Sequence, residues 1–569
     1  MRKTLTSSIG FSLLLIVIFP FTTLILEREN VVLAQSTQTD QSQKSQADNL
    51  IKQAKQHLEV SQNPEAFNAY QQALKIYRQL GNLQGEAEAL NGQGTAYYNQ
   101  DALQSGWYGY KPIYFDGFSS IEAEKSFKQA LAIAKKIGNQ KLEAESLNGL
   151  GRAVDRLSDS GKAIKYYDQA LAIAKRIGDR QLEGRILNYL GIAHSSRAYF
   201  QKILDSHQQA LAIAQKIGDH QLEAFALREL CNLYHRDNID YIDKLSLSRT
   251  EMLQKSLNYC QKSLDVFSQI NDIPTTIRLL QFLSSSYEDV ISKEQLIKYY
   301  QQTLLIAQQT NDRNLQKKMI ARLGNTYHEL GQYQKAIDFY FQALKFEPPV
   351  LETAIHSENL ELYYLYKDIA RSYGELKQYS QAIDYYTRSL AIAKLYNKNN
   401  RDIVKSVSFT EEDILLSLGD AYYDSKNYQK AIDNYQESLS IYRKDKRDLG
   451  TEGSILWNIG NSYFALDNYQ QAIASYQESL SIFKEFKSPS SQASLLSNLG
   501  NSYFAIKQYQ KAIDAYQQAL TIRKELGDRQ GELELLVNIE EATQTLEKQK
   551  SSHRKLNTLH YPKLEQRKR

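Results

Sequence analysis

The stretch Leu499–Ala505 has the sequence Leu-Gly-Asn-Ser-Tyr-Phe-Ala, and Ile459–Ala465 is the same except for its first residue. Both are followed by Tyr-Gln-x-Ala-Ile-x-x-Tyr-Gln-x-x-Leu, and the two copies lie 40 residues apart. A second phrase, Ala-Leu-Ala-Ile-Ala, recurs at the same spacing from Ala130, Ala170 and Ala210. A fixed period of this length predicts an array of repeats that shares one continuous core.

Each period is expected to hold two helices. In the last repeat the first helix and then the second carry stripes of packing residues: Leu496, Leu499, Gly500 and Tyr503, then Ala512, Tyr516 and Ala519. We expect the glycine to face the two alanines, so that the helix axes approach closely, with the tyrosines filling the gaps beside this contact. Gly178 followed by Asp179 is typical of a helix end followed by an N-cap.

This pattern resembles the tetratricopeptide repeat, in a variant with a 40-residue period and extended second helices. The resemblance covers about residues 48–547 and implies an all-α fold, a right-handed α-solenoid superhelix of stacked antiparallel helix pairs. We expect about eleven repeats and a capping helix at 529–547. The fourth repeat is weak, because Ile203 and His207 stand where Ala and Tyr are expected.

Residues 1–34 have the features of an export leader. Basic residues precede an apolar run from Ile9 to Ile25, and Val32 and Ala34 suit cleavage after Ala34. An uncleaved membrane anchor is the alternative. Either interpretation places the protein outside the cytosol, in a periplasm, a thylakoid lumen or the extracellular space. We expect a flexible linker at 35–47 and a basic tail at 548–569.

Insertions are expected at 101–119 and 236–250, between the two helices of the second and fifth repeats. The first insertion carries an aromatic cluster: Trp107, Tyr108, Tyr110, Tyr114, Phe115 and Phe118. The cluster either forms a contact site for a partner, since aromatic residues dominate binding hot spots, or folds back against the solenoid.

Composition and motifs exclude several functions. The 569 residues carry 69 basic and 65 acidic side chains, so no broad basic face for nucleic acid is expected. The sequence lacks a His-Glu-x-x-His zinc motif, a Gly-x-Ser-x-Gly elbow and a P-loop. We therefore predict no catalytic residues, no metal and no cofactor.

Polar residues recur beside the glycine position of the first helices, on the side that lines the concave groove in this family. An asparagine amide offers a donor and an acceptor to the backbone of an extended peptide, and neighbouring aromatics could select side chains. The groove candidates are Asn232, Asn325, Trp457, Asn458, Asn461, Phe464, Asn498, Asn501 and Phe504. The alternative is that asparagine is simply tolerated on an exposed helix face.

The two cysteines, Cys231 and Cys260, take facing positions in the fifth repeat. They would form a disulfide in an oxidising compartment or remain as two buried thiols. The resulting prediction is an exported scaffold that binds a protein or peptide partner. The rivals are a regulatory arm of a CHAT-type protease system without its own catalytic domain, and a structural or assembly protein of the envelope that self-associates.

Overall fold

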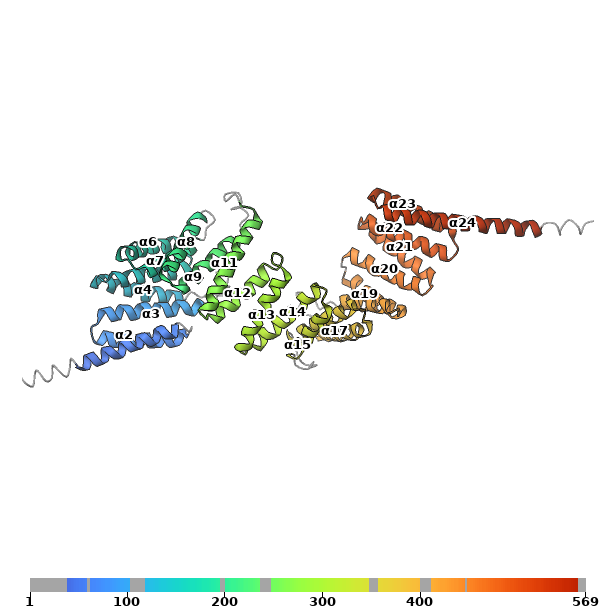
Figure 1. Cartoon of the computed structure of the whole chain (residues 1–569). Helices are drawn as coiled ribbons and strands as arrows, with labels where there is room; N and C mark the ends of the chain where they lie inside the picture. The colour runs from blue at the N-terminus through green and yellow to red at the C-terminus, as the bar shows by residue number, and fades with distance from the viewer. Residues whose placement is uncertain are drawn as a thin grey trace, which may run out of the picture. The chain divides into compact units, whose positions relative to one another are not determined.

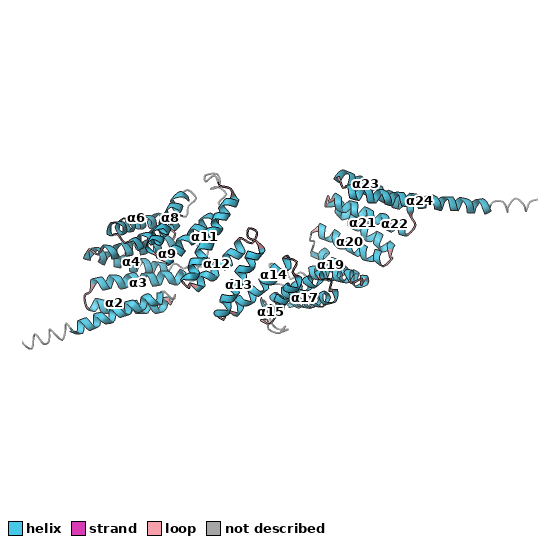
Figure 2. Cartoon of the chain, viewed as in Figure 1, coloured by secondary structure: helices cyan, strands magenta, loops and turns pink. Residues whose placement is uncertain are grey.

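The computed structural model describes residues 38–58, 62–102, 118–194, 200–235, 247–346, 357–399, 411–445 and 448–560. These residues form helices and short connections, and no strand occurs among them (Figure 2). The chain divides into two units, Met1–Glu288 and Asp289–Arg569. Each unit is an α-solenoid of antiparallel helix pairs (Figure 1).

Unit 1 begins with a helix over residues 38–58. Its other helices are α2 (Asn63–Gln79), α3 (Leu83–Ala102), α4 (Phe118–Ile137), α5 (Gln140–Arg156), α6 (Ser160–Ile177), α7 (Arg180–Ala193), α8 (Phe200–Ile217), α9 (His220–His235), α11 (Arg249–Gln269) and α12 (Ile273–Ser286). The first helix pairs with α2, since Ala47, Ile51 and Ala54 are buried in one cluster with Ala66 and Tyr70. The later pairs are α3 with α4, α5 with α6, α7 with α8, and α9 with α11.

Unit 2 begins with α13 and ends with the capping helix α24. Its helices are α13 (Lys293–Gln309), α14 (Arg313–Glu329), α15 (Tyr333–Leu344), α16 (Ser357–Glu375), α17 (Tyr379–Asn399), α18 (Glu411–Asp424), α19 (Tyr428–Asp445), α20 (Leu449–Ala465), α21 (Tyr469–Glu485), α22 (Pro489–Ala505), α23 (Tyr509–Leu526) and α24 (Arg529–His560). The pairs run from α14 with α15 to α22 with α23, and α24 packs on α23.

Two boundaries differ from those expected from the sequence, at the linker and at the end of the capping helix. Helix begins at residue 38, inside the expected linker 35–47, because Ala47 packs into the first cluster. The capping helix continues past residue 547 through most of the expected tail, and Figure 1 shows it running on beyond α23. The described helices stop at Ala102 and His235 and resume at Phe118 and Arg249, where insertions were predicted. The leader 1–34 lies outside the described residues.

Glycine in the first helix provides the seat for a tyrosine ring of the second helix. A Cβ added at Gly500 would lie 2.3 Å from Cε1 of Tyr516, and one at Gly460 would lie 2.5 Å from Cε1 of Tyr476. No real side chain tolerates such distances, so the ring occupies the space that glycine leaves. The expectation that glycine faces the alanines, with tyrosine beside the contact, is therefore wrong.

The seat is kept in the fifth repeat by different chemistry. Cys231 occupies the glycine position and Cys260 the tyrosine position, and a disulfide joins them with a Cα–Cα distance of 5.1 Å. In the weak fourth repeat, His207 replaces tyrosine, and its ring lies over Gly191 and contacts Asn188 Oδ1 through Nδ1 at 3.0 Å. Both repeats therefore keep the helix spacing that their neighbours require.

Helix ends follow the predicted capping chemistry. Gly178 has a φ of 71°, in the left-handed region that only glycine adopts at little cost. Asp179 then accepts a hydrogen bond from the Leu182 amide at 3.0 Å. The same arrangement follows Gly527, where Asp528 accepts from the Gly531 amide at 3.0 Å. These turns fix where one repeat ends and the next begins.

The first helices of successive repeats contact one another. In unit 1, α3 contacts α5, α5 contacts α7, and α7 contacts α9, while in unit 2 α14 contacts α16. We call the surface that the first helices of a unit share its inner wall. Among the described helices, none is long and apolar enough to cross a membrane.

Gly500→Ala should lower the free energy of unfolding by about 1–3 kcal/mol, because the new methyl group displaces the Tyr516 ring. Gly374→Ala is the matched control. That glycine also lies in a helix, but an added Cβ meets no atom within 4 Å. The control should be neutral or stabilising by up to about 1 kcal/mol, since alanine favours helix. Urea unfolding followed by circular dichroism measures both, and equal destabilisation would contradict the tyrosine seat.

The disulfide predicts that the unreduced, unfolded chain contains no titratable thiol and that reductant releases two. It closes a loop with a sequence separation of 29 residues, so Cys231→Ala/Cys260→Ala should cost about 3–4 kcal/mol of stability. Thiol titration in denaturant with and without reductant provides the measurement. Two thiols in the unreduced sample would exclude the bond.

Candidate functional site

Three of the predicted asparagines have side-chain carbonyl oxygens that already accept a hydrogen bond. The hydroxyl of Tyr340 donates to Asn325 Oδ1 at 2.8 Å, that of Tyr476 to Asn461 Oδ1 at 2.8 Å, and that of Tyr516 to Asn501 Oδ1 at 2.7 Å. In each case the tyrosine is the one seated on the preceding glycine. These three asparagines therefore take part in the packing of their repeats.

Asp420 shows what the position requires. It follows Gly419 and accepts the Tyr435 hydroxyl at 2.6 Å, so a carboxylate can replace the asparagine amide. Burial raises the pKa of Asp420. The shared property of these residues is a hydrogen-bond acceptor for a tyrosine hydroxyl that is otherwise removed from water. What remains for a ligand is the amide donor of each asparagine.

The other groove candidates also take part in packing. Asn498 donates to Asn461 Oδ1 at 3.3 Å and Asn458 donates to Asp420 Oδ1 at 3.4 Å, which links successive repeats. The three aromatic candidates are partly buried, and their ring centroids lie 5.2–6.4 Å from neighbouring rings: Trp457 from Phe483, Phe464 from Tyr469, and Phe504 from Tyr509.

Asn232 lies in unit 1, away from the other candidates in sequence. Its Nδ2 donates to Glu229 Oε2 at 3.5 Å, and it lines a cavity of about 40 Å³ with His207. That volume admits about one water molecule and no peptide. In the aromatic insertion, Trp107, Tyr108, Tyr110, Tyr114 and Phe115 lie outside the described residues, and α4 begins at Phe118.

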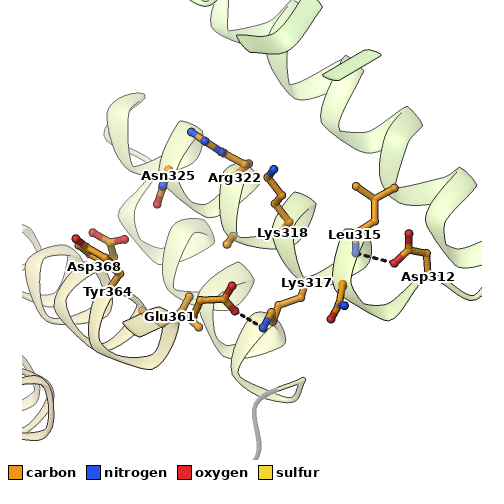
Figure 3. Close-up of a pocket in the computed structure, with 12 residues that line it drawn as sticks. Asp312, Leu315, Lys317, Lys318, Arg322, Asn325, Glu361, Tyr364 and Asp368 are labelled. Atoms are coloured by element: carbon orange, nitrogen blue, oxygen red, sulfur yellow. Dashed lines mark hydrogen bonds and ion pairs between the residues drawn. The ribbon is translucent and has the colours of Figure 1, made fainter. Parts of the chain in front are cut away.

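A pocket of about 930 Å³ opens on the inner wall of unit 2, between α14 and α16 (Figure 3). It is lined by Asp312, Asn314, Leu315, Lys317, Lys318, Ala321, Arg322, Asn325, Glu361, Tyr364, Leu365 and Asp368. We call it the α14–α16 pocket. Its volume lies at the upper end of the range for ligand sites, and it is large enough for several side chains of a bound segment. Of the predicted groove residues, Asn325 alone lines it.

The acidic groups of the α14–α16 pocket are already engaged. Asp312 caps α14 by accepting from the Leu315 amide at 3.0 Å, and Glu361 pairs with Lys317. Asp368 Oδ1 lies 3.5 Å from a terminal guanidinium nitrogen of Arg371. Burial raises the pKa of the Asp368 carboxyl group. Each carboxylate in the pocket therefore has a structural partner.

Two cations of the pocket have no such partner among the described residues. Lys318 and Arg322 are exposed on successive turns of α14, and no carboxylate of the described chain pairs with either. Figure 3 shows Lys317 reaching toward Glu361, whereas Lys318 and Arg322 point away from that pair. The pocket thus presents positive charge, with the amide of Asn325 beside it, to an incoming acidic group.

Sequence reasoning missed Lys318 and Arg322. The sequence nevertheless distinguishes them. Lys318 and Arg322 stand six and two residues before Gly324, and Ser494 and Asn498 stand at the same distances before Gly500. Aligning the repeats on their glycines would have shown that only polar, uncharged residues take these positions in the last repeat. Cations at both of these positions are a difference between the two repeats that helix packing does not require.

A double-mutant cycle tests the role of the asparagines. Asn501→Ala and Tyr516→Phe should each destabilise, and their coupling energy should be about 0.5–1.5 kcal/mol because each residue completes the other's hydrogen bond. The matched cycle of Asn501→Ala with Tyr509→Phe should be additive, since Tyr509 contacts Phe504 instead. Additivity in the first cycle would show that the hydroxyl has another partner.

Comparison with solved structures finds proteins of low sequence identity. BtubC (BKLC) from P. vanneervenii is 19% identical, with 42% of this chain and 93% of that chain covered and a TM-score of 0.34. A signal transduction ATPase with a tetratricopeptide repeat sensor from Pyrococcus horikoshii is 16% identical over 66% of this chain and 54% of that chain, with a TM-score of 0.35. A chain of the APC/C hetero-tetramer Cut9–Hcn1 is 14% identical over 88% and 96%, with a TM-score of 0.32.

No curated protein sequence matches the chain. Sequence models of the tetratricopeptide repeat match residues 119–176, 158–216 and 451–525, and further models of the same repeat match 320–348 and 413–445. The matched segments fall on the helix pairs described above, in both units. The chain is a tetratricopeptide-repeat protein, an all-α scaffold of the kind that mediates protein–protein interaction.

Proposed function

We propose that this scaffold is a non-catalytic adaptor that binds an acidic, extended segment of a partner protein in the α14–α16 pocket. The observation that carries the proposal is the pair of exposed cations Lys318 and Arg322 on the inner wall, beside carboxylates that are already engaged. A ligand carboxylate would supply the missing counter-charge.

The chemistry of the pocket favours a polypeptide over a small molecule. Arg322 offers a planar fork of donors suited to a carboxylate, while Lys318 one turn earlier offers a point charge. The amide of Asn325 can donate to a backbone carbonyl, and the ring of Tyr364, which is 46% exposed, offers an apolar surface. An alternation of acidic and apolar residues in an extended chain would satisfy these groups together.

We also propose that the protein works outside the cytosol. The leader-like residues 1–34 support this location, and the disulfide between Cys231 and Cys260 would be stable in an oxidising compartment. The same pocket would serve a regulatory arm of a CHAT-type protease system or an assembly factor of the envelope. The identity of the captured partner distinguishes these roles.

The charge-reversal variant Lys318→Glu/Arg322→Glu should bind an acidic peptide at least about tenfold more weakly than the wild type, because two attractive charges become repulsive. The probe is a fluorescein-labelled peptide of repeating Gly-Glu-Leu, followed by fluorescence anisotropy. Affinity for the wild type should also fall as salt rises.

Lys548→Glu/Lys550→Glu provides the matched control. These lysines are exposed on α24, outside the α14–α16 pocket, and the variant changes the net charge by the same amount. It should bind the probe with an affinity close to that of the wild type. Equal loss in both variants would show that the peptide responds to overall charge, and no loss in either would remove the pocket from the proposed function.

A further inference from the structure

A chain of contacting aromatic rings and guanidinium groups crosses the inner wall of unit 1. The guanidinium carbon of Arg152 on α5 lies 4.1 Å from the ring centroid of Tyr98 on α3 and 4.8 Å from that of Tyr189 on α7. The ring centroids of Tyr189 and Phe225 on α9 lie 5.8 Å apart, and the guanidinium carbon of Arg228 lies 4.4 Å from the Phe225 centroid. Four successive first helices therefore contribute to one surface, which we call the arginine–aromatic ladder.

Arg152 breaks the packing rule of the repeats. It follows Gly151, on which the Tyr167 ring is seated, and so takes the position of Asn325, Asp420, Asn461 and Asn501. Those residues accept the hydroxyl of the seated tyrosine, whereas a guanidinium has donors only. The substitution gives up an acceptor that four other repeats retain, so packing alone does not account for it.

The charge of Arg152 also has no acidic partner among the described residues. Its terminal nitrogen donates to Asn99 Oδ1 at 3.4 Å, and its Nε is buried without a hydrogen-bond partner. The rings of Tyr98 and Tyr189 both lie against the guanidinium, and a hydrogen-bond acceptor would reach it at its edge, where the N–H groups are. An edge-on guanidinium flanked by aromatic surface suits a planar carboxylate, which accepts two parallel hydrogen bonds.

The other arginine of the ladder shows the pairing that Arg152 lacks. Arg228 also lies over an aromatic ring, and its Nε and a terminal nitrogen donate to Glu229 Oε1 at 2.9 and 2.6 Å. The residue after Arg152 is Ala153, which offers no such group. The same kind of guanidinium thus has a carboxylate partner at Arg228 and none among the described residues at Arg152.

We infer that Arg152 is a second ligand site, which binds the side-chain carboxylate of an aspartate or glutamate in a partner polypeptide. The half-buried rings of Tyr189 and Phe225 lie on the side toward α9 and would receive an apolar residue next to that carboxylate. This site lies in unit 1 and does not depend on the α14–α16 pocket of the proposed function. It would let the scaffold bind a second acidic–apolar motif.

The test uses the full chain carrying Lys318→Glu/Arg322→Glu, so that the α14–α16 pocket does not contribute. The probe is the peptide of repeating Gly-Glu-Leu with both termini blocked. Adding Arg152→Gln should weaken binding by about tenfold or more, and Arg152→Lys by a smaller factor, because lysine keeps the charge without the planar fork. Arg185→Gln, at an exposed position of α7 outside the ladder, should leave affinity unchanged.

Two further measurements separate binding from a structural role. The ¹⁵Nε–H resonance of Arg152 should shift on addition of the probe, and it should not shift with a blocked Gly-Gln-Leu peptide. Circular dichroism and thermal unfolding should show that Arg152→Lys is folded, so that this variant carries the test if Arg152→Gln is unstable. Equal affinity of the Lys318→Glu/Arg322→Glu chain with and without either Arg152 substitution would overturn the inference. Equal binding of an unblocked Gly-Gln-Leu peptide would overturn the choice of a side-chain carboxylate.

Discussion

The seat of a tyrosine ring on a helix glycine is the contact on which both solenoid units depend. At Gly324, Gly419, Gly460 and Gly500, an added Cβ would lie 2.3–2.6 Å from a ring carbon of the tyrosine sixteen residues later. The ring therefore passes across the first helix, and its hydroxyl emerges beside the inner wall. A hydroxyl in that place needs an acceptor, which Asn325, Asp420, Asn461 and Asn501 supply. Helix packing and the chemistry of the inner wall are thus set by one side chain.

The second repeat lacks both the tyrosine hydroxyl and its acceptor. In the second repeat the ring over Gly94 belongs to Phe127, which has no hydroxyl, and the next residue is Thr95, whose own hydroxyl donates to the Asn91 carbonyl at 3.0 Å. In the fifth repeat a disulfide takes the place of glycine and tyrosine. Asn232 nevertheless keeps an amide at the following position, where it donates to Glu229. The third repeat changes the acceptor to Arg152 while it keeps Tyr167 on Gly151, and this departure suggests a ligand.

The repeat period, the helix pairs, the capping turns and the facing cysteines could be predicted because each depends on residues a few turns apart or one period apart. The role of the asparagines could not, because the direction of a tyrosine hydroxyl fifteen residues away follows from side-chain packing and not from spacing. The α14–α16 pocket was missed for a related reason. Its positive charge arises because the carboxylates of the pocket have partners, whereas Lys318 and Arg322 pair with no carboxylate of the described residues. Glu361 pairs with Lys317 only because α14 and α16 lie side by side. Sequence composition, with nearly equal numbers of acids and bases, hides that difference.

The glycine position also distinguishes the last described helix, α24, from the other first helices. The last helix keeps the register of a first helix, since Leu536 stands 40 residues after Leu496 and Leu535 is buried against the preceding pair. At the glycine position, however, it carries Glu540 in place of Gly500. A glutamate at that position offers no glycine seat for the ring of a second helix, and no second helix follows among the described residues. Leu533 and Leu536 consequently remain 62% and 46% exposed on the face that such a helix would have covered. The last described helix therefore differs from the other first helices at the glycine position, although it still carries apolar residues on its outer face.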